Sequence, residues 1–203
     1  MNKYIIETIG TFFLVTTVAF TGNPLAIGVI LTAMVYMGGY ISRGHYNPAV
    51  TMAVYTRGKI NHREAVKYIF FQILGATLAC LTYFLVIGNT FLPKPGAGIS
   101  ILGTALIEII FTFALSFVVL HVATSPKTKD NQYYGLAIGL TLMAGAFAGG
   151  NISGGVYNPA IAVGAILVDM RITSYWLLLI LYVASPLIGG VLAGYAYSLT
   201  QKE

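Results

Sequence analysis

"LAIGVILTAMVYMGGYISRGHYNPAV" occupies residues 25–50, and "LAIGLTLMAGAFAGGNISGGVYNPAI" occupies residues 136–161. The two stretches align at a constant offset of 111 positions without a gap, and 15 of their 26 positions are identical. Unrelated apolar segments would share Leu, Ala and Gly, but not Ile-Ser, Tyr-Asn-Pro-Ala and paired glycines as well. The sequence therefore predicts an internal duplication, with halves over about 1–92 and 101–203 of a single domain, 1–203.

The composition indicates a membrane protein. Of the 203 residues, 57% are hydrophobic and only 8% are charged, whereas a soluble domain usually carries about 25% charged residues. A helix that crosses a bilayer core of about 30 Å needs about 20 predominantly apolar residues. Six stretches qualify, and the expected spans are 4–22, 25–42, 65–88, 101–124, 133–149 and 174–197.

Each half contains three spans, which is an odd number. Two successive copies must then cross the membrane in opposite directions, as an inverted repeat whose site forms near the midplane from discontinuous helices. The segments 48–56 and 159–168 are too short to span, since ten helical residues measure about 15 Å. Each follows Asn-Pro, a preferred helix cap followed by the preferred first residue. The predicted fold class is an all-α membrane protein with six transmembrane helices and two re-entrant half-helices.

The basic residues predict the orientation. Six spans leave both termini on one side, and that side holds nine of the eleven basic residues, which the positive-inside rule places in the cytoplasm. The nine are Lys3, Arg43, Arg57, Lys59, Arg63, Lys67, Lys127, Lys129 and Lys202, and the other two are Lys94 and Arg171. They lie thinly between apolar stretches, so nucleic-acid binding is not expected. We expect a multi-pass protein of the cell membrane.

The chain resembles the aquaporin, or major intrinsic protein, family. The resemblance rests on the two Asn-Pro-Ala motifs, the "GHYNPAVT" context, a glutamate in the first and fourth spans, and "QILGA" at 72–76, "HVAT" at 121–124 and "SPLIGG" at 185–190. It implies a passive channel for water and small uncharged solutes, normally a homotetramer with one pore in each subunit. No cofactor and no metal are implied.

The motifs and the irregular backbone before them predict the pore lining. The motif residues are Asn47, Pro48, Ala49, Asn158, Pro159 and Ala160. Non-helical backbone at membrane depth is tolerated only where it is buried or lines a water-filled cavity, and the carbonyls expected along the path are those of Arg43, Gly44, His45, Tyr46, Gly154, Val156 and Tyr157. Each helix start carries about half a positive charge, so two meeting starts would disfavour cations.

Glu7 and Glu108 are the only acidic residues deep in the spans. The resemblance implies that each accepts hydrogen bonds from the backbone of a re-entrant loop and holds it in place. A proton relay is the alternative, because an ionisable group inside a membrane is a functional candidate by default. Gly28 and Gly139 occupy equivalent repeat positions, and small residues allow helices to approach closely. We expect them to mark the crossing of the second and fifth spans.

The predicted selectivity filter departs from the family pattern. The family usually places an arginine after the second motif, where this chain has Ile161. The other three filter positions, counted from the motifs, are Ile27, Ala146 and Gly155. A wider filter would admit glycerol, urea, ammonia or hydrogen peroxide beside water. An apolar constriction would instead dewet and slow the water flux, and the sequence leaves both outcomes open.

Other classes of protein fit less well. The two aspartates lie near span ends, and neither a hydrolase motif nor metal-ligand spacing occurs, so no enzyme is expected. A secondary active transporter of a small neutral solute is the main alternative, because inverted repeats and broken helices serve transporters too. Its coupling ion would need Glu7 or Glu108. Arg43 stands before "GHYNPA" and is expected either at the cytoplasmic mouth or with its stem extended to the interface.

Overall fold

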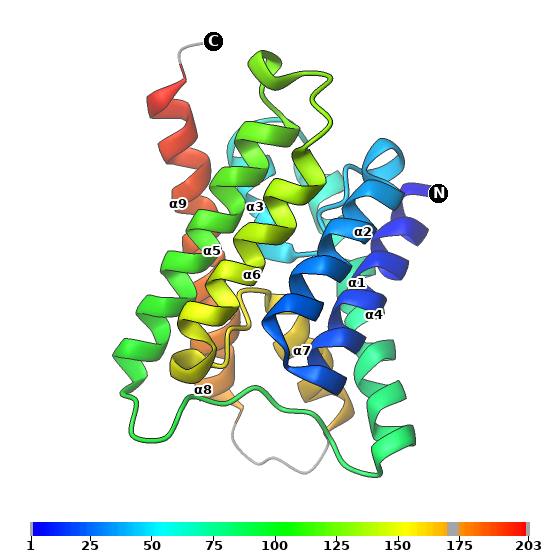
Figure 1. Ribbon diagram of the computed structural model, residues 1–203, viewed down its shortest axis with the longest axis vertical. Coiled ribbons are helices and arrows are strands. Elements are labelled where there is room, and N and C mark those ends of the chain that lie inside the picture. Colours follow the sequence, from blue (N-terminus) through cyan, green and yellow to red (C-terminus); the bar gives the residue numbers. More distant parts are fainter. Residues whose placement is uncertain (1, 170–174, 202–203) are drawn as a thin grey trace.

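The computed structural model describes residues 2–169 and 175–201, and every regular element in these residues is a helix (Figure 1). Five long helices are single elements: α1 (Asn2–Thr21), α2 (Pro24–Ser42), α4 (His62–Ile87), α5 (Ile101–Ala123) and α6 (Tyr134–Ser153). A sixth long helix consists of α8 (Trp176–Leu179), η2 (Ile180–Ala184) and α9 (Ser185–Thr200). All six are long and apolar enough to cross a membrane. The predicted all-α class and the six spans are confirmed.

Two short helices and a single turn complete the described elements. The short helices are α3 (Pro48–Thr56) and α7 (Pro159–Val168), with the bounds that the sequence predicts, and the turn is η1 (Pro126–Thr128). Asn47 caps α3 and Asn158 caps α7, and each Oδ1 accepts a hydrogen bond from the amide two residues later. Proline follows each cap at the first helical position, where its missing N–H costs nothing. The re-entrant half-helices are therefore initiated as predicted.

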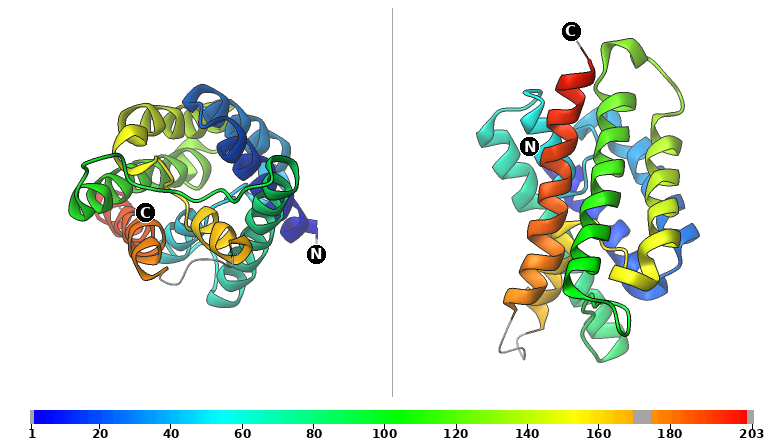
Figure 2. Two further views of the ribbon diagram at one scale, coloured as in Figure 1. Left: turned by 90° about the horizontal axis from the view of Figure 1, so that it is seen from below. Right: turned by 90° about the vertical axis from the view of Figure 1, so that its left-hand side faces the viewer.

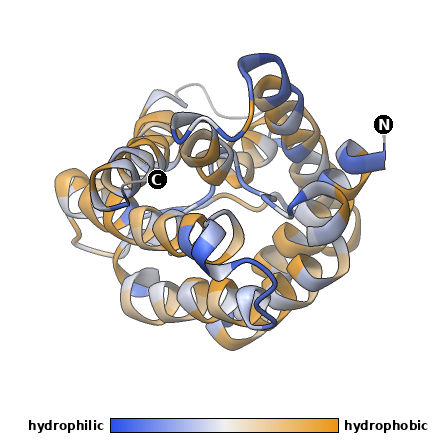
Figure 3. Ribbon diagram, turned by 90° about the horizontal axis from the view of Figure 1, so that it is seen from above, coloured by the Kyte–Doolittle hydropathy of each residue, from blue (hydrophilic) through white to orange (hydrophobic). Residues whose placement is uncertain are grey.

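The long helices form a ring, and the connections cover its two ends. The start of α1, the end of α9 and the α5–α6 connection lie at one end, and the connection over 88–100 crosses the opposite end (Figures 1 and 2). Seen from the end that holds the termini, apolar residues cover most of the ring, and hydrophilic residues gather at connections and helix ends (Figure 3). Two residues used to predict the orientation, Arg171 and Lys202, lie outside the described residues.

The two re-entrant loops have the same backbone conformation. Arg43, Gly44 and Tyr46 have φ values of 74°, 62° and 50°, and the residues 111 positions later, Gly154, Gly155 and Tyr157, have values of 92°, 64° and 47°. The first residue of each trio ends α2 or α6 in the left-handed conformation, and its amide donates a hydrogen bond to a carbonyl four residues earlier. The duplication thus extends to individual backbone angles.

α6 ends at Ser153, four residues beyond the end of the expected span at 149. Within this extension Gly149 leaves space for the Tyr157 hydroxyl, from which a Cβ would lie only 2.1 Å away. The sixth span also differs from a regular helix. It contains a π-helical turn at Ile180–Ala184, just before Pro186, which cannot donate a backbone hydrogen bond. The Ser185 hydroxyl donates to the Ile180 carbonyl at 3.0 Å within this turn.

Close glycine contacts interlock the two halves. A Cβ on Gly139 would lie 2.4 Å from the Gly28 carbonyl oxygen, so the predicted crossing of the second and fifth spans is confirmed. α3 packs on α9 of the other half, where a Cβ on Gly190 would lie 2.2 Å from the Ala49 carbonyl oxygen. α7 packs on α4 in the equivalent way, with Gly164 against the backbone of Ala76. Each half-helix is therefore held by a long helix of the opposite half.

Candidate pore and its asparagine pair

The side chains of Asn47 and Asn158 join the two re-entrant loops. The Asn47 Nδ2 donates to the Tyr157 carbonyl at 2.8 Å, and the Asn158 Nδ2 donates to the Tyr46 carbonyl at 2.9 Å. The Oδ1 atoms cap α3 and α7 by accepting from Ala49 and Ala160. A side-chain amide has two N–H donors, so each asparagine keeps one N–H that these bonds do not use. Pro48, Pro159, Ala49 and Ala160 are buried beside them.

Glu7 and Glu108 bind the two loops from α1 and α5. The Glu7 carboxylate accepts from the backbone amides of His45 and Tyr46 at 3.0 and 2.7 Å. Glu108 accepts from the amides of Val156 and Tyr157 at the same two distances. A serine at the end of each preceding helix also donates to the carboxylate, from Ser42 at 2.7 Å and from Ser153 at 2.6 Å. Both glutamates are fully buried, and neither lines the cavity described below.

The third span of each half supplies loop contacts that the sequence did not single out. The Gln72 Nε2 on α4 donates to Glu7 at 2.8 Å and to Thr51 at 2.9 Å. Tyr68 on α4 donates to the Ser42 carbonyl at 2.6 Å, and Tyr182 in η2 donates to the Ser153 carbonyl at 2.7 Å. "QILGA" contains Gln72, but neither tyrosine lies in a motif. Since each bond joins residues far apart in the chain, local patterns do not reveal it.

A narrow cavity runs past the asparagine pair, between the first and second helices of each half. Its volume is about 20 Å³, counted as the space open to the centre of a water molecule, which is room for little more than one water at a time. The sixteen lining residues form eight pairs related by the repeat, at offsets of 101 or 111. The pairs are Leu14/Leu115, Val18/Val119, Ile27/Ile138, Leu31/Leu142, Gly44/Gly155, His45/Val156, Asn47/Asn158 and Val50/Ile161.

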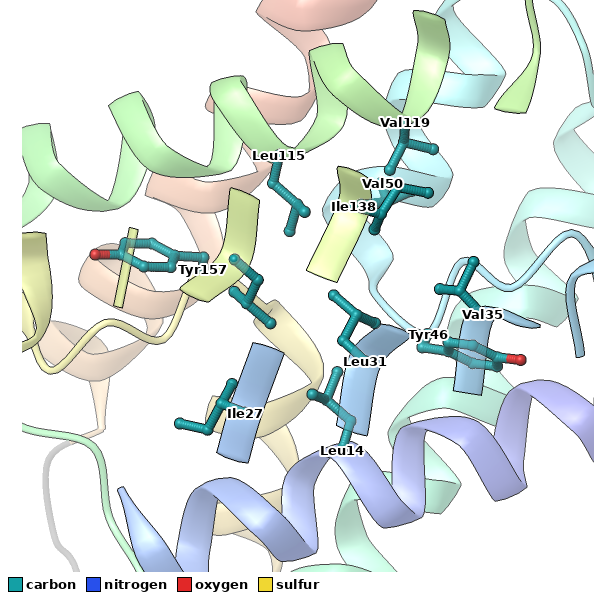
Figure 4. Close-up of a cluster of buried hydrophobic side chains, with 11 residues drawn as sticks. Leu14, Ile27, Leu31, Val35, Tyr46, Val50, Leu115, Val119, Ile138 and Tyr157 are labelled. Atoms are coloured by element: carbon teal, nitrogen blue, oxygen red, sulfur yellow. The ribbon is translucent and has the colours of Figure 1, made fainter. Parts of the chain in front are cut away.

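Seven of the eight pairs match in chemical character, and the wall is mainly aliphatic. Leu14, Leu31 and Leu115 point into the space between the helices (Figure 4). The rings of Tyr46 and Tyr157 point away from it on opposite sides, and their hydroxyls donate to helix carbonyls at 2.9 Å. The wall therefore provides few hydrogen bonds besides those of the two asparagines and the loop backbone.

His45 is the exception to the symmetry, because its partner in the repeat is Val156. Its side chain is 4% exposed, and its Nδ1 shares a hydrogen bond of 3.1 Å with the Thr51 hydroxyl. The Nε2 atom has no protein partner among the described residues, and His45 lines the narrow cavity. The first half therefore places an imidazole where the second half places an aliphatic side chain.

Wide vestibules lie at the two ends of the molecule. One has a volume of about 530 Å³, measured in the same way, and is lined by the connection 88–100, α2, α6 and the second loop. The other, of about 520 Å³, lies at the end that holds the termini and is lined by Arg43, Tyr40 and the α5–α6 connection. The cavity of about 20 Å³ is thus narrow by comparison with both.

The structure brings the four predicted filter positions to one end of the narrow cavity. Ile27 and Gly155 line both the cavity and the vestibule under the connection 88–100. Ile161 lines the cavity and is 2% exposed, and Ala146 lines only the vestibule. None of the four carries a polar side chain. This end therefore offers only backbone groups for hydrogen bonding at these positions.

The residues expected to present carbonyls fall into three groups. Gly44, His45 and Val156 line the narrow cavity, as does Gly155. Tyr46 and Tyr157 use their carbonyls to accept the asparagine hydrogen bonds. The remaining two residues lie at the mouths, Arg43 in the vestibule near the termini and Gly154 in the opposite one.

Comparisons with known proteins agree with this geometry. The family model described as "Major intrinsic protein" matches residues 2–197. The chain is 37% identical to Aquaporin NIP1-1 of Zea mays over 98% of this chain and 74% of that protein, and 37% identical to Aquaporin TIP4-4 of Zea mays over 90% and 72%. The X-ray structure of the aquaglyceroporin from Plasmodium falciparum superposes with a TM-score of 0.80 at 21% identity, covering 96% of this chain and 94% of that one. With two half-helices meeting at paired asparagines, the chain belongs to the major intrinsic protein family, the aquaporins.

Proposed function

We propose that this chain conducts water and small uncharged solutes passively along the cavity between the two vestibules. The observation that carries the proposal is the asparagine pair, which lines that cavity and keeps one unused N–H on each side chain. A file of water molecules needs donors and acceptors to replace the hydrogen bonds lost on entry. The two asparagines supply donors, and the backbone of Gly44, His45, Gly155 and Val156 supplies acceptors beside them.

Ion exclusion follows from the same arrangement. α3 and α7 begin at Pro48 and Pro159 beside this pair, and each start carries about half a positive charge. A cation in the cavity would face both helix starts and an aliphatic wall that cannot replace its hydration shell. A neutral molecule meets no such barrier. The roles of Glu7 and Glu108 are then positional, because they hold the loops that carry the helix starts.

The apolar filter favours a broad range of neutral solutes. Ile27, Ala146, Gly155 and Ile161 place neither a charge nor a bulky polar group at the entrance. Glycerol, urea, ammonia and hydrogen peroxide are the candidate solutes beside water. The small side chains at positions 146 and 155 favour the passage of solutes larger than water.

The transporter alternative is less consistent with these contacts. A coupling ion would need a carboxylate at the transport path, but both oxygens of Glu7 and of Glu108 accept loop hydrogen bonds, and neither residue lines the cavity. No group of three or more His, Cys, Asp or Glu side chains suitable for a metal occurs within residues 2–169 and 175–201. A passive channel fits the contacts of the two glutamates.

We further propose a homotetramer in the cell membrane, with both termini in the cytoplasm. The basic residues support the orientation, since Lys94 is the only described basic residue assigned to the opposite side. The many exposed apolar side chains on the long helices support burial in lipid and against other subunits. Each subunit would contain its own pore.

Stopped-flow light scattering on proteoliposomes tests the proposal. Vesicles are shocked once with sucrose and once with glycerol, and empty vesicles serve as the reference. Shrinkage in sucrose faster than in empty vesicles is expected, and rapid re-swelling in glycerol would establish the broad filter. Shrinkage no faster than in empty vesicles, at verified protein incorporation, would overturn the channel function. Fast shrinkage without glycerol re-swelling would restrict the pore to water.

A further inference from the structure

The vestibule under the connection 88–100, here called the outer vestibule, contains a single charged residue among its described lining residues, Lys94. Three of the four filter positions, Ile27, Ala146 and Gly155, line the same vestibule. The fourth, Ile161, lies in the adjoining cavity, whose sixteen lining residues include neither Asp, Glu, Lys nor Arg. The positive charge that the family usually places at position 161 is therefore absent from the constriction, and a different positive residue stands at its entrance.

The backbone of Lys94 is held against the second re-entrant loop. Lys94 lies between Pro93 and Pro95, and Pro93 is buried, so the ring of each proline fixes its own φ on either side. The Gly96 amide donates to the Ile152 carbonyl at 2.9 Å. A Cβ on Gly154 would lie 3.0 Å from the Lys94 carbonyl oxygen. The connection 88–100 therefore positions Lys94 directly over the loop that leads to the second motif.

The side chains around the filter leave space for the lysine. Ala146 carries only a methyl group and Gly155 carries no side chain, so neither fills the vestibule, whose volume is about 530 Å³. Lys94 is exposed within it. A lysine has a flexible four-carbon stem that ends in a compact charge with three donors. The ammonium group can therefore meet solutes as they enter the filter.

We infer that Lys94 supplies the positive charge of the outer filter in place of an arginine at position 161, and that it excludes cations at this mouth. The inference rests on the proposed channel function and names a specificity-determining residue for it. Clefts lined by charge of one sign and low-dielectric walls focus the electrostatic potential. A cation approaching from this side would meet that potential before it meets the helix starts at the asparagines. A neutral solute would pass unhindered and could accept a hydrogen bond from the ammonium group.

The test measures cation leak and water flux in the same proteoliposomes. Sodium leak and proton leak are followed with entrapped dyes at low ionic strength, and osmotic water permeability is followed by light scattering. The variants are Lys94→Met, which removes the charge at similar length, and Lys94→Arg, which keeps it. Lys67→Met is the matched control, because this exposed lysine lies on α4 and lines none of the three cavities. The double variant Lys94→Met/Ile161→Arg restores a charge at the family position.

We expect Lys94→Met to raise the cation leak by on the order of tenfold with unchanged water flux. The increase should shrink at 0.5 M salt, where screening shortens the range of the charge. Lys94→Arg and Lys67→Met should match the wild type, and Ile161→Arg should reverse the leak of Lys94→Met. The inference would be overturned if the cation leak of Lys94→Met equalled that of the wild type, or if Lys67→Met raised the leak as much as Lys94→Met. Either result would leave the proposed water channel intact. Absence of water flux in the wild type would overturn the proposed function itself, and this inference with it.

Discussion

Gln72 donates a hydrogen bond from its Nε2 to the Oε2 of Glu7 at 2.8 Å, and this bond has no counterpart among the described residues of the second half. Among the described residues, Glu7 accepts from four donors, whereas Glu108 accepts from three. The close contact of Gly75 with α1 recurs as that of Gly189 with α5. These two glycines are 114 positions apart, and at the same offset the residue equivalent to Gln72 is Pro186, which has no side-chain donor. The first loop is therefore held by one more bond than the second.

Replacing Gln72 should weaken the first loop. Gln72→Met removes the donor to Glu7 and the donor to Thr51 at similar side-chain length. We expect the free energy of unfolding to fall by about 1–3 kcal/mol, the cost of leaving buried polar groups without partners. Thermal unfolding in detergent measures the change, and Leu74→Met on the exposed side of the same helix is the control. Equal stabilities of the two variants would show that the bond is dispensable.

The two glutamates should respond unequally to replacement by glutamine. Glu7→Gln puts an NH₂ group opposite a backbone amide and opposite either the Ser42 hydroxyl or the Gln72 amide, which must turn to accept. In Glu108→Gln the NH₂ group can take the place of Oε2, which accepts only from the Tyr157 amide. Since each unpaired buried donor costs about 1–3 kcal/mol, we expect Glu7→Gln to be the less stable variant. Melting temperature and the fraction of monodisperse protein measure this order. Normal folding of both variants together with loss of a proton-coupled flux would instead support the relay hypothesis.

Arg43 has a backbone conformation that favours glycine. Its φ is 74°, and the equivalent residue in the second half is Gly154. We expect Arg43→Gly to be more stable than Arg43→Ala by about 1 kcal/mol, because only glycine adopts the left-handed region without a penalty. Both variants lack the guanidinium group, so the difference in unfolding free energy reports the backbone alone. A stability for Arg43→Ala equal to or above that of Arg43→Gly would contradict the left-handed backbone conformation at position 43.

The crossing of α2 and α6 should not tolerate a methyl group. A Cβ on Gly139 would lie 1.9 Å from the Thr32 hydroxyl and 2.4 Å from the Gly28 carbonyl oxygen, whereas a Cβ on Gly150 of the same helix would meet nothing within 4 Å. We expect Gly139→Ala to destabilise the protein by about 1–3 kcal/mol through overpacking. Gly150→Ala should be neutral or should stabilise by up to about 1 kcal/mol through helix propensity. Thermal unfolding of the two variants measures the difference, and similar losses of stability in both would refute the packing argument.

The duplication explains why much of the fold was predictable. The constant offset of 111 pairs Asn47 with Asn158, and Asn-Pro after irregular backbone is a local signal for a helix start, so the bounds of α3 and α7 follow from the sequence. The six spans follow from hydrophobicity and length, because the bilayer imposes both.

The remaining features depend on contacts between distant segments. The sequence around Gln72 does not reveal its hydrogen-bond partner. The offset between the two halves changes from 111 to 114 in the third span, where the similarity between the halves is weak. The likeness of "IETIGTFFL" at 6–14 to "IEIIFTFAL" at 107–115 already pairs Leu14 with Leu115 at an offset of 101. That the pairs at offsets of 101 and 111 line one cavity is shown only by the structure. The course of the connection 88–100 over the vestibule depends on its bond to Ile152. The roles of the filter residues and of Glu7 and Glu108 remain predictions for measurement.

The exchange of half-helices between the two halves has a consequence for biosynthesis. α3 packs on α9, which leaves the ribosome after all the other described helices, and the Asn47 amide binds a carbonyl 110 residues further along the chain. When the first three spans have been inserted, α3 therefore has neither its packing surface nor the partner of its cap residue. The conducting path can close only after α7 and α9 have been synthesised. A nascent chain of this protein is thus not yet a pore, and the membrane is not exposed to a half-built channel during synthesis.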